Sequence, residues 1–306
     1  DWAWLSGSKP DGSVYAASDI PAITSNTDDL EIVNGTTWNE NIVCVRDVIT
    51  TADNRRALLY QQPYGSIAQL PGWGAGFSVT GSHRIFNAFE FLNSPGQFYF
   101  NKTTGTLYYY PRPGENMNTA DVQAPFVETL LDISGESNAD RIQDITIEGI
   151  TFAYSDYNLR KVGESHGKAT CQGSSIYIAF GDWNWHNDKH EITDTPPGMI
   201  LINSADSIDF VGNSVKHSGN EGISMINDVV NSRVIGNFVT DIAGSGMTIG
   251  HPQHIYSGDG GTHAKYPAGV EGICTNISIA NNVVHNVSTL HGFGGHSGIM
   301  TFFVDS

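Results

Sequence analysis

The sequence is poor in basic residues and has no long apolar run. Its 306 residues hold 15 Lys and Arg against 32 Asp and Glu, a formal net charge of −17. Because phosphate contacts need clusters of Lys and Arg, this deficit excludes a nucleic-acid partner and disfavours strongly anionic substrates. No apolar stretch approaches the roughly 20 residues of a membrane helix, so we expect no membrane partner. We also expect a monomeric protein.

Cysteine is also scarce. Cys44, Cys171 and Cys274 are too few and too scattered for a disulfide framework, and either one disulfide or three buried thiols would fit. The chain starts at Asp1 without a signal-like segment, which indicates a mature or trimmed product. Four sequons and the acidic balance favour an extracellular, secreted glycoprotein, and the asparagines that would carry glycans are Asn34, Asn101, Asn276 and Asn286.

Long helical periodicity is absent, and short β-branched runs bounded by Gly, Asn and Asp recur instead. Gly198, Gly222 and Gly246 follow one another at intervals of 24 residues, and Gly298 resumes the pattern after a longer excursion. A period of this length with two or three short strands per unit is typical of a β-solenoid. Together with the right-handed crossover preference, it predicts an all-β fold with a right-handed parallel β-helix of about 24 residues per rung.

The 24-residue repeat is confined to the C-terminal part of the chain, which predicts two structural regions. We expect a parallel β-helix over 131–306, truncated at its C-terminal end because Ser306 falls within a rung. Residues 1–130 lack the period and carry hairpin signals, such as Thr104-Gly105 between two aromatic strands, so we expect a mostly antiparallel β accessory module there.

Alternation within the repeats predicts which side chains fill the solenoid. Asn213, Asn237 and Asn282 recur after the second strand and are expected to stack as a hydrogen-bonded ladder at a turn. Gly149 and Tyr154 are expected to align with Gly212 and His217. The predicted inward residues are Met199, Leu201, Ile208, Phe210, Val215, Ile223, Met225, Val234, Phe238, Met247 and Ile249.

The run HRIFNAFEFLNSPGQFYFNKTTGTLYYYPRPGENM (83–117), followed by ITIEGITF and the 24-residue units, resembles the parallel β-helix proteins of glycoside hydrolase family 141. The order of these segments carries the resemblance more than any single motif. It implies a secreted glycosidase that acts on plant or microbial polysaccharides, with fucosidase and xylanase as activities of that family. A poly- or oligosaccharide is then the expected partner.

Glycoside hydrolysis uses two carboxylates across the scissile bond, and acids on neighbouring rungs, about 4.8 Å apart, can form such a pair. Glu221 stands out because it opens a strand in a column otherwise filled by Ser245, Ser297 and Pro197. We expect it to face the substrate groove and act as one catalytic carboxylate. Its candidate partners are Asp228, for which a turn role is the competing interpretation, Asp259, or an acid beyond the last residue.

Two long excursions, 156–197 and 251–272, are expected on the binding face of the solenoid. The candidate substrate-binding residues are His251, His263, His296 and Trp185. The alternative is that the Trp merely anchors its loop. No H-E-x-x-H or tight Cys/His spacing occurs, so no metal site or cofactor is expected, although a structural calcium ion stays open.

Two other functions compete with hydrolysis. A polysaccharide lyase would need a Lys or Arg base or a calcium-bridged uronate, and few basic residues follow residue 161. A non-catalytic glycan-binding or surface protein is the other alternative, because β-solenoids also serve as adhesins.

Overall fold

A computed structural model describes residues 10–35, 40–69, 77–168, 176–177, 192–194, 198–250, 272–289, 297–301 and 304–305. The chain forms two compact units. The first unit comprises Asp1–Thr36, Glu40–Val122 and Leu159–Ala169, and the second unit comprises Thr37–Asn39, Gln123–Asn158 and Thr170–Ser306. The division expected at residue 130 stays a prediction. Among the described residues, no helix is long and apolar enough to cross a membrane.

The first unit is built on antiparallel strands, as predicted for the N-terminal part of the chain. The long strand β3 is central: it pairs with β2, β4 and β12, while β1 pairs with β4, β5 with β2 and β11 with β12. Short helical turns lie before β2, after β4 and after β5. The bounds are β1 Gly12–Tyr15, η1 Thr27–Asp29, β2 Glu31–Gly35, β3 Glu40–Thr50, β4 Arg56–Tyr60, α2 Tyr64–Ile67, β5 His83–Phe86, η2 Phe89–Phe91, β11 Arg160–Val162 and β12 Ser165–Lys168.

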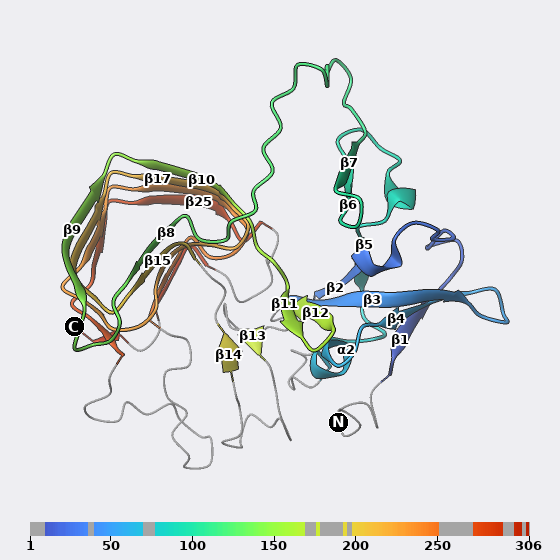
Figure 1. Ribbon diagram of the computed structural model, residues 1–306, viewed down its shortest axis with the longest axis horizontal. Helices are drawn as coiled ribbons and strands as arrows, with labels where there is room; N and C mark the ends of the chain where they lie inside the picture. Colours follow the sequence, from blue (N-terminus) through green and yellow to red (C-terminus); the bar gives the residue numbers. More distant parts are fainter. Residues whose placement is uncertain are drawn as a thin grey trace, which may run out of the picture. The chain divides into compact units, whose positions relative to one another are not determined.

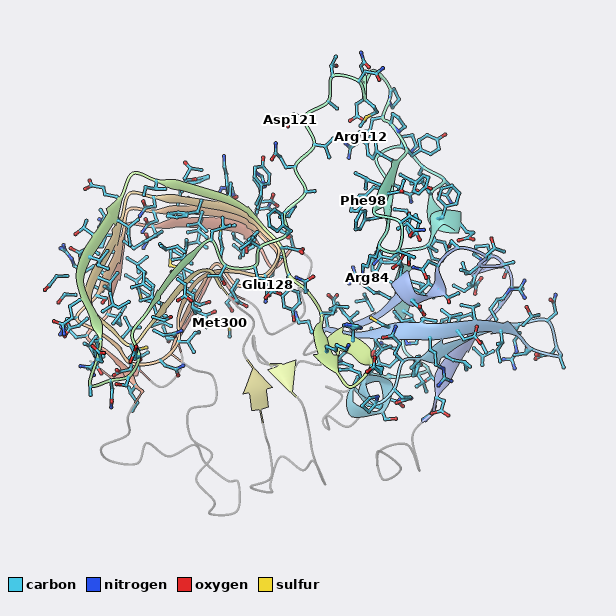
Figure 2. The ribbon with its side chains drawn as sticks, in the orientation of Figure 1. Arg84, Phe98, Arg112, Asp121, Glu128 and Met300 are labelled. Carbon is cyan, nitrogen blue, oxygen red and sulfur yellow. The ribbon has the colours of Figure 1, made fainter. Side chains whose placement is uncertain are left out.

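The predicted aromatic hairpin is present in this unit as β6 (Phe98–Asn101) and β7 (Thr106–Tyr109). Gly105 lies in its turn with φ +65°, a conformation that favours glycine. Alternation turns Tyr99 into the unit, where it is 2% exposed, and leaves Phe98 68% exposed (Figure 2).

The described part of the second unit is built on three parallel sheets, which successive passes of the chain visit in the same order (Figure 1). The first parallel sheet holds β8 Leu131–Ser134, β15 Gly198–Asn203, β18 Glu221–Met225, β22 Met247–Ile249 and β26 Ile299–Thr301. The second holds β9 Ile142–Glu148, β16 Ala205–Val211, β19 Val229–Val230, β20 Arg233–Ile235, β23 Cys274–Thr275, β24 Ser278–Ala280 and β27 Val304–Asp305. The third holds β10 Thr151–Ser155, β17 Ser214–Ser218, β21 Phe238–Ile242 and β25 Val283–Val287. A separate antiparallel pair is formed by β13 Ile176–Tyr177 and β14 Ile192–Asp194.

Stacking of equivalent residues gives this unit one continuous apolar core. Phe210 lies between Ile147 and Val234 in register, and Val215 lies between Phe152 and Val239. These side chains can leave water only by packing against the passes above and below, which is why the repeat has to be regular. The fully buried members of the core include Met199, Ile200, Ile202, Ile208, Phe210, Val215, Ile223, Met225, Val234, Val239 and Met247.

The asparagine ladder is confirmed. Asn237 Oδ1 accepts the backbone N–H of Asn213 at 2.8 Å, and Asn282 Oδ1 accepts that of Asn237 at 2.8 Å. Each amide also donates to a carbonyl of a neighbouring pass, as Asn237 Nδ2 does to Phe210 O at 2.9 Å. The ladder therefore satisfies backbone groups that the turn would otherwise leave buried and unpaired.

Three details of the predicted register and facing are wrong. Gly222, Gly246 and Gly298 align, but Gly198 pairs with Glu221, one residue away from the predicted column. Consequently Ile200 and Ile202 face the core, and Leu201 lies opposite Ser224 on the other face. Phe238 is 42% exposed, because the next residue, Val239, takes the inward position opposite Val215.

Candidate functional site

The first parallel sheet carries polar residues on the face that points away from the apolar core. Ser224 of β18 lies opposite Thr248 of β22, and each sits between core residues of its own strand. Strand alternation therefore directs both hydroxyls to the opposite face. Even so, Ser224 is 0% and Thr248 1% exposed. A buried polar face on a sheet is unusual enough to mark a candidate site.

Glu221 belongs to this polar face. Its side chain is buried, and its Oε2 accepts a hydrogen bond from Thr248 Oγ1 at 2.8 Å. Ser218 Oγ donates to its backbone carbonyl at 2.8 Å, which fixes the start of β18. The predicted alignment of Glu221 with Ser245 and Ser297 is confirmed. The backbone carbonyls of the two serines accept hydrogen bonds from Gly222 N and Gly246 N, respectively. On the other side of Glu221, the aligned residue is Gly198 and not Pro197.

Asn220, which the sequence reasoning did not select, lies beside this carboxylate. It is 1% exposed, and neither Oδ1 nor Nδ2 has a hydrogen-bond partner. A Cβ on Gly244 would lie 2.9 Å from both Asn220 Oδ1 and Glu221 Oε1. Glycine at position 244 is what lets the next pass approach these two oxygens. A buried amide without partners costs about 1–3 kcal/mol, so a ligand hydroxyl that bonded it would recover that energy.

Asp228, the predicted partner of Glu221, is held in an ion pair. Arg141 binds its carboxylate through two hydrogen bonds, Nε to Oδ2 at 2.9 Å and Nη2 to Oδ1 at 2.7 Å. From Glu221 to Met225 alone, β18 extends about 13 Å, beyond the roughly 9.5 Å that separates an inverting pair. The structure thus does not bring these two acids together, and the Asp228 carboxylate ties the turn after β18 to Arg141, the residue before β9.

A second set of aligned residues lies on the third parallel sheet, one from each pass, and each residue has a positive φ. The set consists of Tyr154, His217, Asp241 and Asn286. The Tyr154 ring stacks on His217 at 4.9 Å, His217 Nδ1 pairs with the Asp241 carboxylate, and Asn286 Nδ2 donates to Asp241 at 3.4 Å. The predicted alignment of Tyr154 with His217, and of Gly149 with Gly212, is confirmed. All four side chains are partly or largely exposed, so this column is a surface ladder.

The remaining predicted site residues lie outside the described residues. They are the candidate acid Asp259 and the candidate substrate-binding residues His251, His263, His296 and Trp185. Within the described ranges, no three His, Cys, Asp or Glu side chains gather as a metal site. Cys44 and Cys274 are buried free thiols.

The four predicted glycosylation asparagines differ in accessibility. Asn276 and Asn286 are exposed, and Asn101 is half-buried. Asn34 is 1% exposed, and its amide bonds Ser78 N and Ser82 O. The glycosylation prediction for Asn34 is therefore corrected: in the folded unit its amide nitrogen is inaccessible and already used.

The fold of the chain is shared with a solved structure. A solved structure titled "Glycoside hydrolase" superposes with a TM-score of 0.74 over 92% of this chain, at 21% sequence identity. The alignment covers 49% of that protein, so the chain spans about half the length of the structure it matches. At this identity the likeness concerns the fold.

The family resemblance is more specific in the first unit. Residues 10–112 match the model of the GH141 insertion domain. The resemblance to glycoside hydrolase family 141, predicted from the segments around the aromatic hairpin, is thereby confirmed. No curated protein sequence matches the chain.

Proposed function

We propose that the chain is part of a secreted glycoside hydrolase of the family 141 type and that Glu221 is one of its catalytic carboxylates. The match of the first unit to the GH141 insertion domain supports the reaction class. The observation that carries the residue assignment is the buried Glu221 carboxylate on a polar sheet face, beside an amide without partners. The second unit is proposed as a right-handed parallel β-helix, on the order of its strands and the crossover preference of parallel strands.

The carboxylate can serve the reaction as follows. A general acid must deliver a proton to the glycosidic oxygen, and Glu221 is proposed to deliver it from the polar face of the sheet. Asn220 would bond a hydroxyl of the sugar next to the scissile bond and so fix it over Glu221. The second carboxylate is proposed to be Asp259 or an acid after Ser306, because Asp228 is held by Arg141.

The proposed substrate is a neutral plant or microbial glycan. The net charge of −17 disfavours polyanions, and the family resemblance suggests fucosylated glycans or xylan. His251, His263, His296 and Trp185 are proposed to line the same groove, with imidazoles bonding hydroxyls and the indole covering a sugar face.

The test is a reducing-sugar assay on xylan, fucosylated glycans and pectic side chains. Glu221→Gln keeps the size of the side chain and removes its titrating proton, so the rate should fall by about 10²-fold or more. Glu148→Gln is the matched control, since Glu148 is exposed on β9 and its substitution should leave the rate unchanged. Circular dichroism should show that both variants fold.

Three outcomes would contradict the proposal. Near wild-type hydrolysis by Glu221→Gln would remove its catalytic role. An unsaturated product, detected by its ultraviolet absorbance, would show a lyase. Absence of product from the wild-type chain on every glycan would favour a non-catalytic glycan-binding protein.

A further inference from the structure

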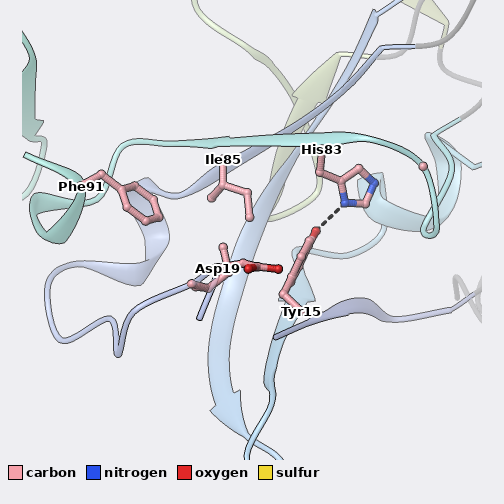
Figure 3. Close-up of a pocket in the computed structure, with 7 residues that line it drawn as sticks. Tyr15, Asp19, His83, Ile85 and Phe91 are labelled. Atoms are coloured by element: carbon pink, nitrogen blue, oxygen red, sulfur yellow. Dashed lines mark hydrogen bonds between the residues drawn. The ribbon is translucent and has the colours of Figure 1, made fainter. Parts of the chain in front are cut away.

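The first unit contains a pocket of its own, with a volume of about 340 Å³ (Figure 3). It opens between the end of β1, the turn that follows, β5 and η2. Pockets near the lower end of the range for small-molecule sites suit one sugar ring rather than several. The lining residues are Tyr15, Asp19, Ile20, Gly81, His83, Ile85 and Phe91.

One side of the pocket is polar and nearly uncharged. Tyr15 Oη donates to His83 Nδ1 at 2.5 Å (Figure 3). His83 Nε2 donates to Ser78 O at 2.7 Å, so both ring nitrogens are occupied. Burial lowers the pKa of His83, although the bond to Ser78 opposes this, and burial raises the pKa of Tyr15 to about 12. At neutral pH the phenol oxygen can still accept a hydrogen bond from a ligand.

Asp19 supplies the negative charge of this site. Its carboxylate is exposed and accepts one bond from Ser18 Oγ at 3.0 Å, which leaves further acceptor capacity on both oxygens. A carboxylate that faces a pocket without a Lys or Arg among its lining residues binds hydroxyl donors and repels anions.

The rest of the pocket is apolar. Ile20, Ile85 and Phe91 form this part, and Ile20 is only 5% exposed. A pyranose ring has the same division: C–H groups on its faces and hydroxyls around its edge. The pocket thus matches a neutral sugar better than a purely apolar or a charged ligand.

The walls are fixed before any ligand arrives. Asn34 accepts from Ser78 N at 2.9 Å and donates to Ser82 O at 3.1 Å, which clamps the loop that leads into β5. A Cβ on Gly81 would come within 2.6 Å of Asn34 Nδ2, so glycine is needed there. The Phe77 ring stacks on His83 at 5.1 Å. A preorganised site loses less conformational entropy on binding.

A second clamp holds the apolar wall. The Glu90 carboxylate, next to Phe91, accepts hydrogen bonds from the backbone N–H groups of Thr24 and Ser25 at 2.7 and 2.8 Å. Both hydroxyls donate to the same carboxylate, at 2.9 and 2.5 Å. These bonds tie η2 to the 24–25 segment and fix the position of the phenylalanine.

We propose that this pocket binds a single residue of a neutral glycan, with Asp19 and Tyr15 bonding its hydroxyls and Phe91 packing against its ring. The site gives the first unit a carbohydrate-binding function of its own. It goes beyond the proposed hydrolysis and does not use Glu221.

The test measures binding to the full chain by isothermal titration calorimetry or saturation-transfer NMR. The probes are xylotriose, cellotriose and a fucosylated trisaccharide, with digalacturonate as the anionic comparison, and all measurements use the Glu221→Gln background to prevent turnover. Asp19→Asn removes the charge at an exposed position and should weaken binding of the neutral probe at least tenfold. Phe91→Ala should do the same.

Asp47→Asn is the matched control, because Asp47 is an exposed acid of β3 outside the pocket. Its affinity should equal that of the background chain. The proposal is overturned if no neutral probe binds, if digalacturonate binds better, or if Asp19→Asn leaves the affinity unchanged. Failure of Glu221 as a catalyst would appear in the hydrolysis assay and would leave this binding result intact.

Discussion

Phe210 and Phe238 offer a direct test of which residues hold the second unit together. Both are phenylalanines in neighbouring parallel sheets, and both look equally apolar in the sequence. Phe210 is 0% exposed and packs on Phe152, with ring centroids 5.9 Å apart. Phe238 is 42% exposed and meets His285 edge-on at 5.2 Å. Replacing each by alanine therefore removes the same atoms from two different environments.

The expected costs differ in kind. Phe210→Ala loses the transfer free energy of the ring and leaves a cavity between Ile147 and Val234, which together cost about 3–5 kcal/mol. Phe238→Ala leaves no enclosed cavity. Full burial of a phenylalanine is worth about 1.5–3 kcal/mol, and a ring that keeps two fifths of its surface in water loses about 1–1.5 kcal/mol.

The assay is chemical denaturation of both variants and the wild-type chain, followed by near-UV circular dichroism. Because two units can unfold separately, the comparison uses the midpoint of the transition that Phe210→Ala shifts. We expect that midpoint to move at least twice as far for Phe210→Ala as for Phe238→Ala. Equal shifts would refute the assignment of the inward face at β21.

Three further results are expected. Asn237→Ala should destabilise the second unit by about 2–4 kcal/mol in the same assay, because it leaves Asn213 N and Phe210 O buried without partners; a wild-type midpoint would contradict the ladder. Asp228→Asn should lower thermal stability yet keep the hydrolysis rate within about twofold, since it breaks the Arg141 pair rather than the site; a large loss of rate would restore Asp228 as a catalytic acid. Burial raises the pKa of Glu90, but the bonds from Ser25 and Thr24 outweigh it and lower the value from 4.5 to about 2. The ionised Glu90 carboxylate therefore stabilises the fold fully above pH 4.5, and this stabilisation is lost as the pH falls towards 2. The melting temperature should fall less over this pH range for Glu90→Gln than for the wild-type chain.

The repeat could be predicted because its turns need particular residues. Gly149, Gly212 and Gly236 have φ of 71°, 64° and 69°, and few other residues adopt that conformation at low cost. The side chain of the asparagine that follows the glycine in each complete unit bonds the backbone of the preceding pass. Such positions fix the spacing in the sequence, so the column of turns and the ladder were both readable from it.

The direction of individual side chains was harder to predict, because it depends on where the register shifts. Gly198 pairs with Glu221 rather than with Gly222, so β15 lies one residue out of the register that the 24-residue spacing indicates, and Leu201 turns away from the core. A shift of one residue exchanges the two faces of a strand. Phe238 follows the turn asparagine directly, and the backbone there places Val239 inward instead. The pattern of hydrophobic residues alone does not predict such one-residue shifts in register.

Only part of the candidate site could be predicted from the sequence. Glu221 could be selected because a carboxylate in a column of small residues breaks the repeat. Asn220 could not, since an asparagine before a strand is an ordinary turn residue in this chain. Its significance comes from Gly244, a residue of the next pass, whose missing side chain lets the backbone approach both the amide and the carboxylate. The geometry of this candidate site thus depends on a contact between passes, and a sequence repeat can show that two residues are neighbours without showing how closely they meet.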